Sequence, residues 1–223
     1  MTFSLIARCA ATGQFGMVIA SSSPAVAARC AHVRAGVGAV ASQNITDPAL
    51  GPELLDLLAQ GKSAQAALIA VTDGRAYMDY RQLLVVDAQG GRAVHSGRQV
   101  LGLWNEALGQ DCAAGGNLLA DPNVPSAMVA AFENAKGHLG DRLMTGLFAG
   151  LAAGGEAGPV MSAGLKIADR LVWPLVDLRV DWSVDPIQAL ETAWGVYRPQ
   201  MAAYVQRAID PTQAPSFGVP GDA

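Results

Sequence analysis

Charged residues are scarce in this sequence and make up 15% of its 223 residues. The formal net charge is −4, and lysines and arginines form no cluster along the chain. Proteins that bind nucleic acid or an anionic membrane surface present such clusters, so neither is an expected partner. No stretch reaches the roughly 18 consecutive apolar residues of a membrane helix. The opening residues lack the basic segment of a signal peptide, and we expect a cytoplasmic protein.

Cysteine and histidine are also rare, with three of each. Cys9, Cys30 and Cys112 lie far apart, fit no CxxC spacing and are odd in number. This pattern favours reduced thiols packed in the core of a cytoplasmic protein. Three histidines exclude a His-rich metal site, and no HExxH sequence occurs. We therefore predict no metal and no cofactor.

Apolar residues are abundant, at 51% of the sequence, and the mean hydropathy is +0.26. So little polar cover predicts a large core and additional surface buried between subunits. We expect a homo-oligomer, most simply a dimer. The aromatic residues Trp194, Tyr197 and Tyr204 are candidate interface anchors, although packing within one chain explains them nearly as well.

The apolar pattern predicts strands in hairpins and helices in blocks. Phe3, Leu5 and Ala7 alternate with Thr2, Ser4 and Ile6, which is the period of a strand that begins at residue 2, and the chain turns near Gly13 and returns through 17–23. Residues 24–34 carry no clear pattern. Further along we expect a strand over 35–43, a helix over 51–61 and a second helix over 62–74, for which Ser63 is the expected N-cap. A hairpin over 81–97 follows, and then a helical stretch over 124–151 that is broken near Gly137. The last elements are a hairpin over 162–182 and a final helix or helix pair over 185–209, capped by Asp185.

This order predicts a layered α+β fold with mainly antiparallel sheets, rather than a doubly wound α/β fold. No linker-like stretch divides the chain, so we expect one domain over residues 1–210. The Pro/Gly-rich residues 211–223 are expected to form a flexible tail.

Two motifs resemble functional sites, but a structural role explains each of them better. Gly36 and Gly38 lie in a GxGxxA sequence, but a dinucleotide site needs a strand before it and a helix after it. The surrounding residues favour a close-packed strand instead. Asp177, Arg179 and Asp181 share one strand face, where alternating charges are more typical of a salt-bridge ladder than of a catalytic carboxylate pair.

Thr2 is the strongest candidate for chemistry. Initiator methionine is normally removed when the second residue is as small as threonine, which would give Thr2 both a hydroxyl nucleophile and a free α-amine. That amine has a reference pKa of about 7.7–8.0, so it can act as the general base for its own side chain. The N-terminal hairpin brings Ser21–Ser23 beside Thr2. We expect the Thr2 side chain to face a cavity there.

Seven segments in order resemble a known family: TFSLIAR, the TGxxG turn, VIASSSPAV, VRAGVGAVASQN, RQLLVVDAQG, GNLLA and DLRVDW. They are similar to a bacterial family termed domain of unknown function 1028, which is assigned to the N-terminal-nucleophile (Ntn) hydrolase superfamily. The resemblance covers about residues 2–195. It implies a four-layer αββα sandwich and amide-bond hydrolysis, with Thr2 at the nucleophile position.

The chain departs from the family's pattern at two places. Family members carry a lysine just after the ASS-type strand end, where this chain has Ser22 or Ser23. The family's glycine loop has the form GGDxRGxQSAAL, in which Glu156 keeps the acid and Met161 replaces the usual glutamine. Ser22, Ser23 and Glu156 are therefore candidate substrate contacts.

Amide and guanidinium groups complete the predicted site. Asn117 and the Gln43–Asn44 pair are candidate donors to an oxyanion, and each could equally form a turn. Arg34 suits a substrate carboxylate because its guanidinium binds in a bidentate manner, but it could instead pair with a surface acid.

The predicted activity is hydrolysis of an amide bond in a small polar substrate. An alternative from another class is a catalytically inactive Ntn-fold protein that binds a small metabolite. A nucleotide-dependent enzyme acting through Gly36 and Gly38 ranks third.

Overall fold

The alternating residues at the start of the chain form the predicted hairpin. β1 (Thr2–Arg8) pairs antiparallel with β2 (Phe15–Ser21), and Phe3 faces Ala20 across the pair. Gly13 occupies the turn at φ 77°, a conformation that glycine adopts without a steric penalty. This computed structural model describes residues 1–219.

The hairpin lies in the middle of a six-stranded antiparallel sheet. Its strand order is β10-β9-β2-β1-β8-β7, so β1 has a neighbour on each side. The other strands of this sheet are β7 (Asn105–Gly109), β8 (Cys112–Asn117), β9 (Ser162–Ala168) and β10 (Val176–Val180).

A second antiparallel sheet has the order β3-β4-β5-β6. Its strands are β3 (Ala31–Arg34), β4 (Gly38–Asn44), β5 (Arg81–Asp87) and β6 (Arg92–Ser96). The two sheets stack face to face over a core that includes Ile6, Met17 and Ile19 from the first sheet and Ala41 and Leu84 from the second.

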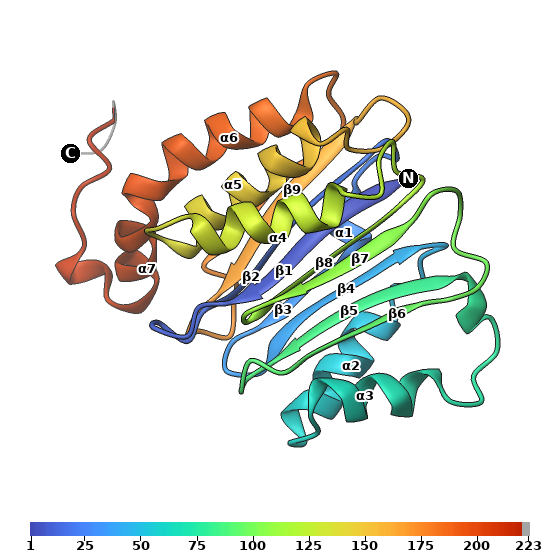
Figure 1. The fold of residues 1–223 in the computed structure, drawn as a ribbon. Coiled ribbons are helices and arrows are strands. Elements are labelled where there is room, and N and C mark those ends of the chain that lie inside the picture. Colours follow the sequence, from blue (N-terminus) through green and yellow to red (C-terminus); the bar gives the residue numbers. More distant parts are fainter. Residues whose placement is uncertain (220–223) are drawn as a thin grey trace.

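Helices cover the outer face of each sheet (Figure 1). Apolar side chains of α4 and α5 pack on β1 and β2, and those of α2 and α3 pack on β4 and β5. The helices are α1 (Val26–Cys30), α2 (Leu50–Ala59), α3 (Ala64–Thr72), α4 (Val124–Asn134), α5 (Leu139–Ala152), α6 (Pro186–Tyr197) and α7 (Met201–Ile209), with short 3₁₀ turns at Met78–Tyr80, Arg198–Gln200 and Pro211–Gln213. The predicted α+β, four-layer αββα sandwich with antiparallel sheets is confirmed.

Two predicted helix boundaries follow from local chemistry. The helical stretch is broken at Gly137, which has φ 97° between α4 and α5. The Ser63 hydroxyl caps α3 by accepting the Ala66 N–H at 3.2 Å. Asp185 occupies the N-cap position of α6, but its side chain makes no capping hydrogen bond within residues 1–219.

The structure supports a structural role, not a catalytic or nucleotide-binding one, for the glycine motif at Gly36 and Gly38 and for the charged strand face at Asp177. Gly36 lies in the β3–β4 turn, and a strand rather than a helix follows Gly38, so the dinucleotide context is missing. Asp177 contacts Lys166 at 3.4 Å and Arg179 at 3.3 Å, which makes a salt-bridge ladder. All three cysteines are free and buried, as predicted.

The late aromatic residues find partners inside the chain. Trp194 is buried and donates to Asp141 Oδ1 at 3.0 Å, and the Tyr197 hydroxyl donates to the Leu175 carbonyl at 2.9 Å. Tyr197 stacks on Tyr204 at 5.6 Å between ring centroids. Packing within the chain therefore accounts for them, and the dimer stays a prediction.

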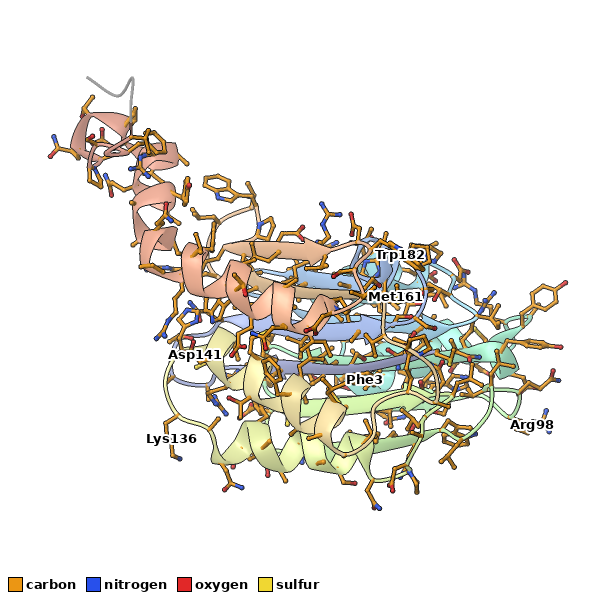
Figure 2. All side chains as sticks on the ribbon, turned by 90° about the horizontal axis from the view of Figure 1, so that it is seen from above. Phe3, Arg98, Lys136, Asp141, Met161 and Trp182 are labelled. Atoms are coloured by element: carbon orange, nitrogen blue, oxygen red, sulfur yellow. The ribbon has the colours of Figure 1, made fainter. Side chains whose placement is uncertain are left out.

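The C-terminal segment stands away from the sheets. In Figures 1 and 2 the red part of the ribbon, which contains α7, extends beyond the end of the sandwich. Arg207 in α7 donates to the carbonyls of Pro215 and Ser216 and lies 3.6 Å from the Phe217 ring centroid. The division into a domain over 1–210 and a tail over 211–223 stays a prediction, and 220–223 lie outside the described residues.

Within residues 1–219, no helix is both long and apolar enough to cross a membrane.

Candidate active site at the start of β1

Thr2 lies at the end of the space between the two sheets. Successive side chains of a strand point to opposite faces; Phe3 packs toward α5, close to Gly150, so Thr2 and Ser4 face the second sheet. Figure 2 shows Phe3 in the interior of the sandwich. Thr2 pairs with Asn117 on β8, and the β1–β2 register brings Ser21 to its other side. The start of β1 is therefore surrounded by polar side chains on both flanking strands.

The predicted convergence of hydroxyls around Thr2 is present. Thr2 Oγ1 lies 3.4 Å from Ser21 Oγ, and Ser21 Oγ lies 2.8 Å from Ser23 Oγ. The Thr2 and Ser21 hydroxyls both donate to the carbonyl oxygen of Met1. Thr2 is only 5% exposed while Met1 is attached. Its side chain thus contacts other hydroxyls and a carbonyl, and it is buried instead of facing an open cavity.

Arg29 supplies the cation of this cluster, and the sequence analysis missed it. Its Nη2 donates to Ser23 Oγ at 3.1 Å, while Nη1 donates to the carbonyl of Pro24 at 2.6 Å. Arginine only donates hydrogen bonds, so Ser23 must pass its own hydrogen to Ser21, whose hydrogen goes to Met1. The hydroxyl chain is therefore oriented from the guanidinium toward the Met1 carbonyl.

A network of buried amides lies behind Thr2. Gln82 is its centre: Oε1 accepts from Gln43 Nε2 at 2.8 Å and from Asn117 Nδ2 at 3.2 Å. Gln82 Nε2 donates to Ser96 Oγ at 3.1 Å and to the Gly116 carbonyl at 3.2 Å. The network joins both sheets, because Gln43 Oε1 also accepts from Ser4 Oγ on β1 at 2.7 Å.

The Glu106 carboxylate, which can only accept, fixes the orientation of these amides. Ser96 donates to the Glu106 carboxylate at 2.7 Å, so it must accept from the Gln82 amide nitrogen. Gln82 Oε1 therefore faces Asn117, which donates to it. The buried atom of Asn117 that lacks a partner among the described residues is Oδ1, an acceptor. Beside Thr2, Asn117 thus offers an acceptor together with one remaining N–H.

Glu156 lies on the glycine loop next to this cluster. It forms a β-bridge with Leu119, two residues beyond Asn117, and is 5% exposed. Neither carboxylate oxygen has a hydrogen-bond partner in the part of the chain that the structure describes. Burial raises the pKa of Glu156 from 4.5 to about 7, although the chain's amino terminus and Ser22 act in the opposite direction. A carboxyl of this kind exchanges its proton near neutral pH.

The pH dependence of stability should report this buried carboxyl. In the unfolded chain Glu156 loses its proton near its ordinary value of 4.5, whereas the folded chain keeps it to about pH 7. The folded state therefore binds more protons over this range, so the free energy of unfolding falls as the pH rises from 4.5 to 7, by roughly 3 kcal/mol. Glu156→Gln should remove this decline and leave the variant more stable than the parent at pH 8.

Urea unfolding at several pH values between 4.5 and 8 would measure the effect. Glu191→Gln is the matched control, because Glu191 is exposed on α6 and accepts from Gln188. It should leave the pH dependence of the parent unchanged. An unaltered decline in Glu156→Gln would mean that another group causes it.

Three predicted site residues, all in the described part of the chain, form no hydrogen bond with Thr2. Arg34 pairs with Gly38 at the opposite end of β4 from Gln43 and binds Asp56 at 2.8 Å on the surface. Asn44 has φ 73° and ties two loops together, through the Tyr80 carbonyl and the Leu101 N–H. Gln43 is fully buried, with both ends of its amide committed to the network. These residues support the sheet or its loops.

The described residues do not meet the needs of a metal site. Within the described range 1–219, no three His, Cys, Asp or Glu residues cluster closely enough to hold a metal ion.

The fold defines the class: a four-layer αββα sandwich built on two stacked antiparallel sheets. The sequence model of DUF1028, a family of unknown function, matches residues 2–190. The chain belongs to this family, as the resemblance implied.

A solved structure of a family member agrees with this assignment. A crystal structure of a DUF1028 protein from Silicibacter pomeroyi is 28% identical, covers 92% of this chain and 90% of that one, and has a TM-score of 0.86. Anbu, an ancestral beta-subunit, from Yersinia bercovieri is 11% identical over 91% of this chain and 97% of that one, with a TM-score of 0.37. An Anbu mutant from Hyphomicrobium sp. strain MC1 is 13% identical over 98% and 100%, with a TM-score of 0.43. Both Anbu likenesses are too distant to inform the function of this chain. No curated protein matches the sequence.

Proposed function

We propose that this protein hydrolyses an amide bond in a small polar substrate, with Thr2 as an N-terminal nucleophile. One observation carries the proposal: the Thr2 and Ser21 hydroxyls donate to the same carbonyl oxygen at the buried start of β1. Once Thr2 leads the chain, its α-amine takes the proton from Oγ1, directly or through water, as that oxygen attacks the substrate carbonyl. The protonated amine gives this proton to the leaving nitrogen as the C–N bond breaks, and water then hydrolyses the ester on Oγ1 and restores the hydroxyl.

The Met1 carbonyl stands in for the substrate carbonyl in this proposal. Ser21 donates to its oxygen, and Ser23 and Arg29 orient that donor from behind. A donor held in place before the reaction stabilises the developing oxyanion without reorganisation. The remaining N–H of Asn117 is a candidate second donor, and its Oδ1, which has no partner among the described residues, is a candidate acceptor for the α-amine. Arg29 thus takes the part that the resemblance assigns to a lysine.

Access to Thr2 depends on processing. With Met1 attached, Thr2 is 5% exposed and has no free amine. This observation favours the alternative function, a catalytically inactive Ntn-fold protein that binds a small metabolite, for as long as any residue precedes Thr2. The two functions therefore differ in the first residue of the natively expressed chain.

The mass of the untagged, natively expressed protein tests this point. We expect it to be smaller than the full sequence by one methionine residue. The processed chain should then hydrolyse members of a panel of small amides and acyl-amino acids. A chain that retains Met1 would exclude the amine base and favour the binding function.

A further inference from the structure

The glycine loop and the start of α6 line an open cavity of about 270 Å³. Leu151, Val160, Val184 and Ile187 contribute apolar walls. Glu156 is the buried polar side chain in the lining, and neither of its oxygens has a partner within the described residues. A buried carboxyl without a partner is costly, which points to a group that enters the cavity from outside.

The charges in this lining favour a cation. Of the described residues that line the cavity, Glu156 and Asp185 are acidic and none is basic. Asp185 sits at the N-cap of α6, where its charge offsets the positive end of the helix. Its side chain forms no ion pair elsewhere in residues 1–219. Glu156 is therefore the buried acid among apolar walls, and the positive group that acts on it is the chain's own amino terminus.

The cavity also adjoins the residue that precedes Thr2. The Met1 side chain lies against the glycine loop, with its Cε 2.8 Å from the position that a Cβ on Gly158 would take. Gly158 itself lines the cavity. Removal of Met1 therefore frees the space against Gly158 that its unbranched, apolar side chain fills.

We propose that this cavity binds an aliphatic primary ammonium group of the substrate, with Glu156 as its counter-ion and the apolar walls around its alkyl stem. This assignment of a substrate class rests on the proposed function, in which Thr2 attacks the amide of the same molecule. Apolar walls with a single buried acid match such a group, because its stem is hydrophobic and its head is charged.

Titration of the Met1-free chain with n-butylamine, n-butanol and butyrate at pH 8 tests the proposal by calorimetry. We expect n-butylamine to bind at least about tenfold more tightly than n-butanol, and butyrate not to bind. Glu156→Gln should reduce the affinity for n-butylamine to that for n-butanol. Asp185→Asn should weaken it a few-fold, and Glu191→Gln, the exposed control on α6, should leave it unchanged.

Each contrary result overturns the proposal. These are preferential binding of butyrate, equal binding of amine and alcohol by the parent chain, or unchanged amine binding in Glu156→Gln. The comparison of ligands on the parent chain needs no variant to fold. A separate assay of amide hydrolysis tests Thr2: Glu156-dependent binding of amine without hydrolysis would reject the nucleophile and keep the ammonium site, whereas hydrolysis without amine binding would do the reverse.

Discussion

Replacing Thr2 by alanine is expected to abolish acyl transfer from p-nitrophenyl acetate to the processed protein. Removal of a catalytic nucleophile costs a factor on the order of 10³ or more in turnover. The fold should tolerate the change, because in the processed chain the Thr2 hydroxyl keeps Ser21 as its neighbour, and one such hydrogen bond contributes about 1 kcal/mol. Release of p-nitrophenol, together with intact mass to detect the acetylated chain, measures the effect.

Thr2→Ser is the matched variant for this test. It keeps the hydroxyl and the α-amine and should retain part of the activity, whereas Thr2→Val keeps the shape of threonine and should be inactive. Melting temperatures of the variants would show that each is folded. Full turnover in Thr2→Ala would reject Thr2 as the nucleophile and leave the metabolite-binding function.

Gln82→Ala is expected to cause the largest loss of stability. It would leave buried polar groups of Gln43, Asn117 and Gly116 without the partner they have in the parent chain. Each unsatisfied buried group costs roughly 1–3 kcal/mol, so the free energy of unfolding should fall by about 4 kcal/mol or more. Urea denaturation of the parent and the variant measures this difference.

Gln188→Ala provides the control for this change. Gln188 is exposed on α6 and donates to Glu191, so its loss should shift the free energy of unfolding by less than about 0.5 kcal/mol. A loss of under 1 kcal/mol in Gln82→Ala would show that the amide network is not a main link between the sheets.

The sequence was a good guide to the fold where side-chain pattern and local chemistry agreed. The hairpin at Gly13, the break at Gly137 and the cap at Ser63 each depend on a few neighbouring residues. β7 and β8 were missed because residues 105–117 are rich in alanine and glycine, which have low strand propensity. Their strand structure comes from pairing with β1, a contact distant in sequence.

The candidate site shows the same division. The cluster of Thr2 with Ser21 and Ser23 could be predicted because a hairpin register fixes which residues become neighbours. The position of Arg29 could not be predicted, because Arg29 lies on a helix that begins after Ala25. Ala25 has a φ of 52°, and no pattern in the sequence indicates this conformation. Arg34 was a plausible choice by residue type, but the direction of β3 carries it to the far end of the sheet.

Because β1 lies in the middle of its sheet, the ribosome releases the two halves of the candidate site far apart in time. The hairpin with β2 uses local contacts and can form while synthesis continues. Its other edge waits for β8, which belongs to the second half of the chain, and Glu156 follows later still. A nascent or truncated chain thus carries Thr2 without Asn117 and Glu156, so the reactive constellation exists only after most of the protein has been made.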